Sequence, residues 1–206
     1  QMTDLPLVLA STSRFRRALL EKLGLPFVTL SPNVDETPQP DETPRQLVQR
    51  LAEAKARAAA SAHPRALIIG SDQVACIDGA ILGKPGSRDR AVEQLARASG
   101  RTVIFYTGLC LLNSATARRQ VACEPFQVHF RRLRPSQIRA YVEREQPYDC
   151  AGSFKSEGLG IALFRQLEGE DPNALIGLPL IRLVEMLAEE GVDVLATPSS
   201  WPAPRP

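Results

Sequence analysis

The chain has 206 residues, of which 44% are hydrophobic and 23% are charged, which is typical of a globular protein with a sizeable core. Its 25 basic and 23 acidic residues leave a formal net charge of +2, too small for a general surface that binds nucleic acid. No apolar run reaches the roughly 18 to 20 residues of a membrane span, and the N-terminal segment lacks the pattern of a signal peptide. We therefore expect a cytoplasmic protein that binds neither membranes nor nucleic acid.

The first 24 residues are typical of a strand, a turn and a helix. The apolar run PLVLAST ends in hydroxyl residues, and SRFRRALLEKLG continues with leucines at helical spacing. Ser11, Thr12 or Ser13 can cap the start of this helix, and Gly24 can end it. The turn should point free backbone N–H groups at whatever lies beyond the strand, as in many phosphate sites.

A second apolar run, PFVTLS, precedes an acidic, proline-rich loop over residues 33–44. Thr43 and Gln46 form a predicted capping box, with a proline at the first helical position between them. A long helix should follow, and its predicted buried face consists of Leu47, Leu51, Ala54 and Ala58. Lys55 comes four residues after Leu51, so we expect it close to that face.

The rest of the chain alternates strand-like and helix-like segments. ALIIGSDQVACI predicts a central strand interrupted by polar residues, Asp78-Gly79 a turn, and SRDRAVEQLARAS a helix. TVIFYTGLCLLN and RRQVACEPFQVHFRRL predict two long strands joined at Asn113-Ser114, and PSQIRAYVERE and LPLIRLVEMLAEEG two more helices. This order favours an α/β fold with a mixed twisted sheet and flanking helices. We expect one domain over residues 4–194 and a disordered tail over 195–206.

The four cysteines stand singly among apolar or small neighbours, at positions 76, 110, 123 and 150. There is no CxxC pair, and only two histidines are present to complete a metal site. We therefore expect reduced, mostly buried thiols without a disulfide or catalytic role.

Polar residues gather at the ends of four apolar segments, a pattern that fits a phosphoanhydride site. Cations and helix N–H groups would bind phosphate there, and carboxylates would bind a metal or water. Each group also has a simpler interpretation as a solvated helix face or loop. The groups are Ser11 with Arg14, Arg16 and Arg17; Asp35 with Glu36; Asp72 with Gln73; and Lys84 in a GKP sequence.

Asp72 is the strongest single candidate, because it lies within an apolar strand. Burying a carboxylate costs several kcal/mol unless a partner compensates the charge. Lys55, Lys84 or a bound metal could be that partner. The alternative is an ion pair with a structural role only.

The segments LASTSRFRR, VDETP, EAKA, IIGSDQV, GKP, FYTG, AGSFKSEGLG and NALIGLPL follow one another as in the Maf family, which the chain resembles over about residues 5 to 190. The resemblance implies an elongated α/β protein with two lobes around a central cleft. It also implies a nucleotide diphosphatase that cleaves between the α and β phosphates with a divalent cation, Mg²⁺, Mn²⁺ or Co²⁺.

The same resemblance implies roles for single residues. Asp72 matches the family's catalytic aspartate, and Lys55 and Lys84 match conserved polar positions that we expect to serve catalysis with it. Ser11, Arg16 and Glu36 match further conserved polar positions. We expect Ser11 and Arg16 to bind the substrate, and Glu36 to hold the metal, with Asp72 as a second candidate ligand. Arg14 stands where the family commonly has proline, so its phosphate role does not follow.

Three further positions resemble the bacterial subgroup that hydrolyses 7-methyl-GTP: Phe15, Gln73 and Glu157. The methylated base is cationic, so an aromatic ring at Phe15 could stack on it. Glu157 could accept hydrogen bonds from both N–H donors of guanine, and Gln73 would adjust the pocket beside Asp72. Alternatively, Phe15 packs in the core and Glu157 caps a turn.

Two other functions remain as alternatives. A sibling enzyme for thymidine or uridine triphosphate would carry arginine instead of Phe15 and glutamine instead of Glu157. A non-enzymatic nucleotide sensor linked to cell division would not need both Asp72 and the full set of cations. The sequence leaves open whether Asp72 is a general base or a metal ligand, and whether the protein is a monomer or a homodimer.

Overall fold

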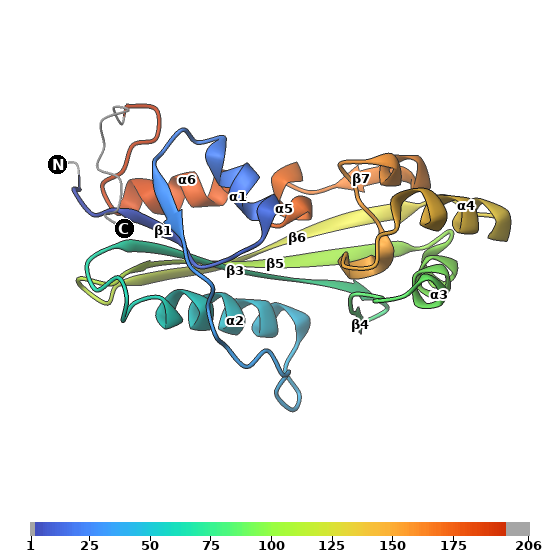
Figure 1. The fold of residues 1–206 in the computed structure, drawn as a ribbon, viewed down its shortest axis with the longest axis horizontal. Coiled ribbons are helices and arrows are strands. Elements are labelled where there is room, and N and C mark those ends of the chain that lie inside the picture. Colours follow the sequence, from blue (N-terminus) through green and yellow to red (C-terminus); the bar gives the residue numbers. More distant parts are fainter. Residues whose placement is uncertain (1–2, 197–206) are drawn as a thin grey trace. The chain divides into compact units, whose positions relative to one another are not determined.

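The computed structural model describes residues 3–196 and divides into two compact units. The first unit comprises the chain up to residue 73 together with residues 107–124 and the segment from 177 onward; the second comprises residues 74–106 and 125–176. A seven-stranded sheet has the strand order β2-β1-β3-β5-β6-β7, with β4 paired to β3 (Figure 1). Parallel and antiparallel pairs both occur, so the predicted mixed α/β fold is confirmed. Three long strands contribute to both units: β3 (Leu67–Ile77), β5 (Thr102–Asn113) and β6 (Arg119–Phe130).

In the first unit, helices cover both faces of a sheet whose strands β2, β1 and β3 run parallel (Figure 1). Helix α2 lies on one face, and α1 and α6 lie on the other. The elements confined to this unit are β1 (Leu7–Leu9), α1 (Arg14–Glu21), β2 (Phe27–Thr29), α2 (Pro44–Ala58) and α6 (Leu180–Glu189).

Helix α2 begins with the predicted capping box, in which Thr43 and Gln46 each bond the backbone N–H of the other. The predicted buried face is only partly right, because Ala54 is only half-buried and Ala58 is exposed. The buried residues of the helix are Leu47, Val48, Leu51, Ala52 and Ala56. Small side chains on this face let the helix approach the sheet closely.

Two glycines on the sheet make this approach possible. A Cβ atom at Gly70 would lie 2.0 Å from the carbonyl oxygen of Ala52, and one at Gly108 would lie 2.1 Å from that of Val48. The backbone of α2 therefore rests directly on β3 and β5. This contact places the C-terminal half of α2, which contains Lys55, against the middle of β3.

The second unit contains the predicted β3–β4 turn, in which Asp78 and Gly79 both have positive φ, 49° and 78°. Helices α3 and α4 contact each other, and both contribute buried residues to one hydrophobic core. The glycine-rich stretch after α4 forms 3₁₀ turns and leads into a strand, β7, that the sequence pattern did not indicate. The elements are β4 (Ala80–Leu82), α3 (Arg88–Ala98), α4 (Pro135–Glu145), η1 (Ala151–Ser153), η2 (Leu159–Leu163), β7 (Phe164–Glu168) and α5 (Pro172–Ile176).

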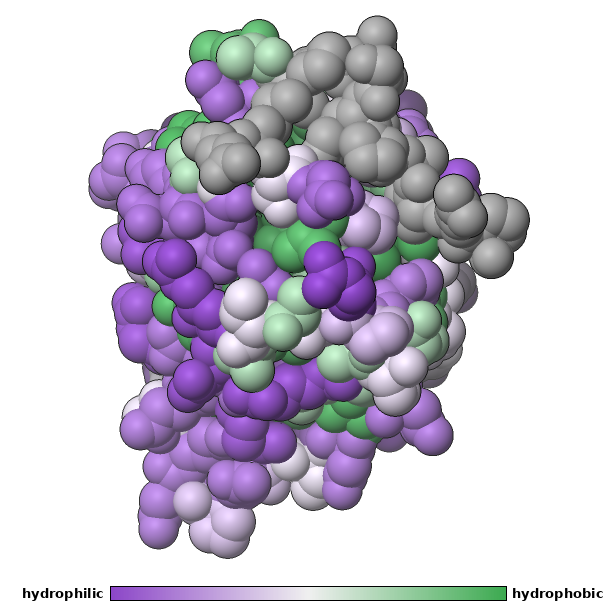
Figure 2. Space-filling view, turned by 90° about the vertical axis from the view of Figure 1, so that its left-hand side faces the viewer, coloured by the Kyte–Doolittle hydropathy of each residue, from purple (hydrophilic) through white to green (hydrophobic). Residues whose placement is uncertain are grey.

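Among residues 3–196, no helix is both long and apolar enough to cross a membrane. Hydrophilic residues cover most of the face in Figure 2, and its hydrophobic residues form small patches separated by polar ones. The predicted disordered tail lies outside the described residues from position 197 onward.

Candidate active site

The turn between β1 and α1 is held by two serines. Ser13 caps the helix by accepting a hydrogen bond from the backbone N–H of Arg16 (3.3 Å), so among the three predicted candidates it is the one that caps the helix. Ser11 is buried, and its hydroxyl oxygen accepts a bond from the N–H of Ser13 at 3.1 Å. Ser11 therefore shapes the turn that brings Arg16 to the end of the strand.

Asp72, Lys55 and Glu36 meet at one point in the first unit. The ammonium Nζ of Lys55 lies 2.8 Å from Oδ1 of Asp72 and 2.7 Å from Oε1 of Glu36. The side chains of Lys55 and Asp72 are only 12% and 11% exposed, whereas that of Glu36 is 59% exposed. The predicted partner cation of Asp72 is therefore Lys55, and the acidic loop contributes a second carboxylate to the same ammonium.

The environment of Asp72 acts on its pKa in opposing directions. Burial is the largest influence and raises the pKa above its usual value. The nearby charges of Lys55 and Arg16 lower it, and Glu36 raises it slightly further. The net effect is a raised pKa, which makes this carboxylate a stronger base than an exposed aspartate.

Arg16 and Ser71 both donate to the carbonyl oxygen of Gly177. The distances are 2.8 Å from Nε of Arg16 and 3.1 Å from the Ser71 hydroxyl, which also contacts the carbonyl oxygen of Gly108 at 2.9 Å. Burial lowers the pKa of Arg16, while the charges of Asp72 and Glu36 oppose that change. The hydrogen bond to Gly177 thus orients the guanidinium of Arg16, whose charge interacts with the carboxylates of Asp72 and Glu36.

Ser71 was not among the predicted site residues, although it is fully buried beside Asp72. The available signal was a second polar residue inside an apolar strand, directly before the aspartate. Because a buried hydroxyl needs a partner, that signal predicts a structural bond. It could not identify the two glycine carbonyls as the partners.

Gln73 and Phe15 have defined surroundings in the same unit. The amide Nε2 of Gln73 donates to the hydroxyl of Thr107 at 3.0 Å, which orients the glutamine side chain next to Asp72. Phe15 is only partly buried, and the guanidinium of Arg14 lies 5.0 Å from its ring centroid. The ring is therefore not a core residue, and it already contacts a cation.

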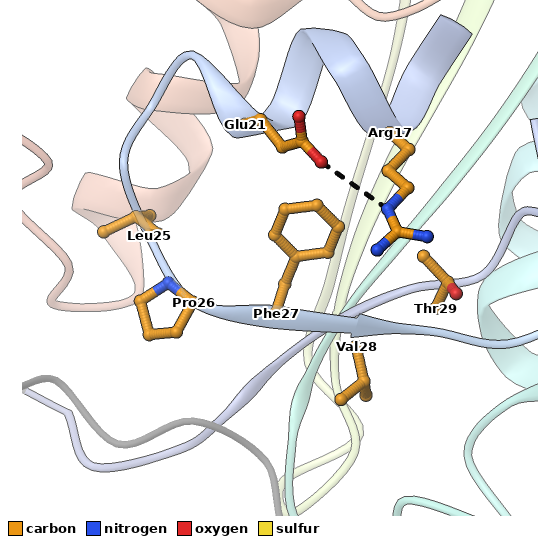
Figure 3. A pocket seen from close by; sticks show the side chains of 7 residues that line it. All are labelled: Arg17, Glu21, Leu25, Pro26, Phe27, Val28 and Thr29. Atoms are coloured by element: carbon orange, nitrogen blue, oxygen red, sulfur yellow. Dashed lines mark ion pairs between the residues drawn. The ribbon is translucent and has the colours of Figure 1, made fainter. Parts of the chain in front are cut away.

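Arg17 has different neighbours from Arg16 and lies outside the group around Asp72. It pairs with Glu21 at 3.5 Å and lines a hollow of about 510 Å³ between α1 and β2 (Figure 3). Phe27 and Thr29 of β2 line the same hollow. Of the three arginines in this helix, Arg16 is the one whose charge acts on Asp72.

Lys84 and Glu157 belong to the second unit. Lys84 is exposed on the loop after β4, and the amide of Gln94 in α3 holds that loop by donating to the carbonyl oxygen of Gly83 (2.9 Å). Gln94 also accepts a hydrogen bond from the buried hydroxyl of Ser153. Glu157 is exposed in the loop that follows Ser153.

The cysteines are free thiols, as predicted. Burial raises the pKa of Cys76 to about 11 and that of Cys110 to about 12, so neither forms a thiolate at neutral pH.

The donor atoms at Asp72 and Glu36 suit a hard divalent cation. Two carboxylates from different segments converge on one ammonium group, and their oxygen atoms match the ligands that Mg²⁺ and Mn²⁺ prefer. Within residues 3–196 no group of three or more His, Cys, Asp or Glu side chains could hold a metal. Magnesium commonly takes only one or two protein carboxylates and completes its shell with water and substrate phosphates.

The mixed α/β fold, and the buried carboxylate of Asp72 paired with a cation within the sequence GSDQV, both fit the family that the sequence motifs indicated. The chain belongs to the Maf family: the family of Maf-like proteins matches residues 6–190. It is 62% identical over 188 residues to the 7-methyl-GTP pyrophosphatase of Alcanivorax borkumensis, which covers 91% of this chain and 95% of that protein. It is 60% identical to the protein of the same name from Pseudomonas aeruginosa, over 91% of this chain and 98% of that protein. The 7-methyl-GTP pyrophosphatase of Vibrio cholerae is 59% identical over 94% of this chain and 100% of its own length.

Proposed function

We propose that this protein hydrolyses 7-methyl-GTP to 7-methyl-GMP and pyrophosphate with the help of a divalent cation. The observation that carries the proposal is the buried carboxylate of Asp72, which has a raised pKa and a cation at 2.8 Å. The relatives near 60% identity, all named for this reaction, support the choice of substrate.

In the proposed reaction Asp72 accepts a proton from the attacking water. The water oxygen forms a bond to the α phosphorus, the bond from that phosphorus to the bridging oxygen breaks, and pyrophosphate leaves with the electron pair. A base is most effective when its pKa lies close to the working pH. Burial moves the pKa of Asp72 in that direction, and the charge of Lys55 opposes the shift by favouring the ionised form.

Arg16, Lys55 and Lys84 neutralise the triphosphate in this proposal, with Ser11 shaping the turn that presents Arg16. Glu36 would hold the divalent cation, and the oxygen of Asp72 that does not accept the proton could be its second protein ligand. When bound, the cation would withdraw charge from the phosphate oxygens and lower the pKa of a water bound to it.

Recognition of the base is assigned to Phe15, Gln73 and Glu157. The ring of Phe15 offers a face to a cationic base, a contact of roughly 0.5 to 2 kcal/mol. Glu157 is an exposed acceptor with two oxygens, which suits the two N–H donors of guanine. Its negative charge also favours 7-methylguanine over neutral bases.

The reaction is tested by measuring pyrophosphate release from 7-methyl-GTP, GTP, UTP and dTTP with Mg²⁺, Mn²⁺ or Co²⁺. We expect 7-methyl-GTP to have the highest kcat/KM. Asp72→Asn keeps the shape of the side chain and should reduce kcat at least about a hundredfold with folding intact. Near-normal turnover in that variant would exclude Asp72 as the base, and a preference for UTP or dTTP would refute the proposed substrate.

Base recognition is tested with Glu157→Gln, which removes the charge and one of the two acceptors. We expect a loss of roughly 2 to 4 kcal/mol in transition-state binding for 7-methyl-GTP and little change for UTP. Glu170→Gln makes the same charge change at another exposed position of the second unit and should leave the ratio of the two substrates unaltered. An equal loss on every nucleotide would refute the recognition role of Glu157.

A further inference from the structure

The loop over residues 155–160, which carries Glu157, is tied at both ends to one turn of α4. The hydroxyl of Tyr141 accepts a hydrogen bond from the backbone N–H of Lys155 at 2.9 Å. The carboxylate of Glu145, four residues later on the same helix, accepts one from the N–H of Gly160 at 3.1 Å. Tyr141 also donates to that carboxylate at 3.1 Å, so the two anchors are bonded to each other.

The loop fits closely around these anchors. A Cβ atom at Gly158 would lie 2.7 Å from Oε2 of Glu145, and one at Gly160 would lie 2.2 Å from the carbonyl oxygen of Lys155. The N–H of Gly158 donates to that same carbonyl oxygen at 3.2 Å. The backbone therefore closes on itself and rests on the Glu145 carboxylate, with Glu157 at its exposed side.

The chain entering the loop is packed into the core of the second unit. The ring of Phe154 packs edge-to-face against Phe105, Phe130 and Phe164, with ring centroids 4.9 to 5.4 Å apart. Tyr141 is 4% exposed, and burial raises the pKa of its hydroxyl, which therefore keeps its proton for Glu145 at neutral pH. Every contact in this arrangement lies within the second unit.

We propose that Tyr141 and Glu145 are positioning residues that set the selectivity for the base by holding the backbone on either side of Glu157. The proposal rests on the function proposed above, because it assumes that Glu157 reads the base. Accurate two-point recognition requires that a side chain be held to within about half an ångström, and an exposed glutamate on an untethered loop would not be. Neither Tyr141 nor Glu145 contacts the base in this scheme.

The primary test compares Tyr141→Phe with Tyr148→Phe. The first change removes the hydroxyl that bonds Lys155 and Glu145 but keeps the packed ring. The second removes a hydroxyl from another tyrosine that packs on the same core. We expect Tyr141→Phe to lower the ratio of kcat/KM for 7-methyl-GTP over UTP about tenfold, mainly through KM, and Tyr148→Phe to leave it unchanged.

Rescue by a conservative variant separates positioning from general stability. Glu145→Gln keeps an oxygen that can accept from Gly160 and should retain most of the selectivity, whereas Glu145→Ala should lose it.

Amide hydrogen exchange offers a second measurement independent of turnover. The N–H of Lys155 should exchange faster in Tyr141→Phe, and that of Gly160 faster in Glu145→Ala.

A double-mutant cycle with Glu157→Gln gives the decisive result. If Tyr141 acts through Glu157, then Tyr141→Phe should change the substrate ratio little once Glu157 is replaced. Independent, additive effects would overturn the inference, as would an unchanged ratio in Tyr141→Phe while Glu157→Gln relaxes it. If Glu157→Gln itself leaves the ratio unchanged, the proposed recognition role fails and the positioning role fails with it.

Discussion

Replacing Lys55 with methionine tests how the buried pair with Asp72 is maintained. Methionine keeps the unbranched apolar stem but removes the ammonium that lies 2.8 Å from the carboxylate. Because both side chains are close to 90% buried, the carboxylate would keep its desolvation cost and lose its nearest compensation. Removing one partner of a buried pair typically costs about 3 to 5 kcal/mol.

The lower end of that range applies here, since Arg16 still attracts Asp72 in the variant. A loss of about 3 kcal/mol in a chain of this size corresponds to a Tm lower by roughly 6 to 12 °C. The lost pair with Glu36 adds little, because that carboxylate is exposed and becomes solvated.

The loss should depend on pH in a defined direction. Burial already raises the pKa of Asp72 in the folded protein, and removing Lys55 raises it further. When the pKa of a carboxyl group is higher in the folded than in the unfolded protein, the folded state binds the proton more tightly. The resulting stabilisation is complete at a pH below the unfolded-state pKa, and it is lost as the pH rises through the folded-state pKa. Lys55→Met should therefore be nearly as stable as the parent in acid and progressively less stable toward neutral pH.

Urea unfolding between about pH 4.5 and pH 8 measures this difference directly. The double variant Lys55→Met with Asp72→Asn should recover most of the lost stability at neutral pH, since no buried charge is left unpaired. A loss that is equal at every pH, or a double variant as unstable as the single one, would refute the reasoning.

Two further predictions concern the metal and the helix–sheet contact. Glu36→Gln should raise several-fold the Mg²⁺ concentration that gives half-maximal activity, because one of two candidate carboxylate ligands is lost; an unchanged requirement would make Glu36 only a loop residue. Gly108→Ala should destabilise the protein by about 1 to 3 kcal/mol in denaturant unfolding, because its Cβ would lie 2.1 Å from the carbonyl oxygen of Val48. Gly83→Ala is the control, since its Cβ meets nothing within 4 Å; equal losses in both variants would contradict the close contact.

Features that depend on neighbours in the chain were predictable from the sequence. The capping box at Thr43 and Gln46 and the turn at Asp78 and Gly79 form as expected, because the bonding groups lie within four residues of each other. The strand around Asp72 was also predictable, since its apolar run is long enough to outweigh the polar interruption.

The buried face of α2 and strand β7 were not predictable in the same way. Alanine gives a weak hydrophobic signal, so the pattern included Ala58, which is exposed, and did not include Ala52, which is buried. The segment of β7 contains Arg165 and Glu168 and becomes a strand because it pairs with β6.

In the candidate site, too, some features were predictable from the sequence and others depend on how the chain packs. The sequence alone determined that a carboxylate would be buried at Asp72 and that it would need a cation, because burial of an apolar strand follows from its composition. Only the tertiary structure decided that Lys55 is its partner and that Arg16, rather than Arg17, directs its charge at Asp72. An ion pair depends on a separation of about 3 Å, and that separation is set where the backbone of α2 meets Gly70. No local pattern encodes such a contact, because it joins segments that are brought together only when the helix packs on the sheet.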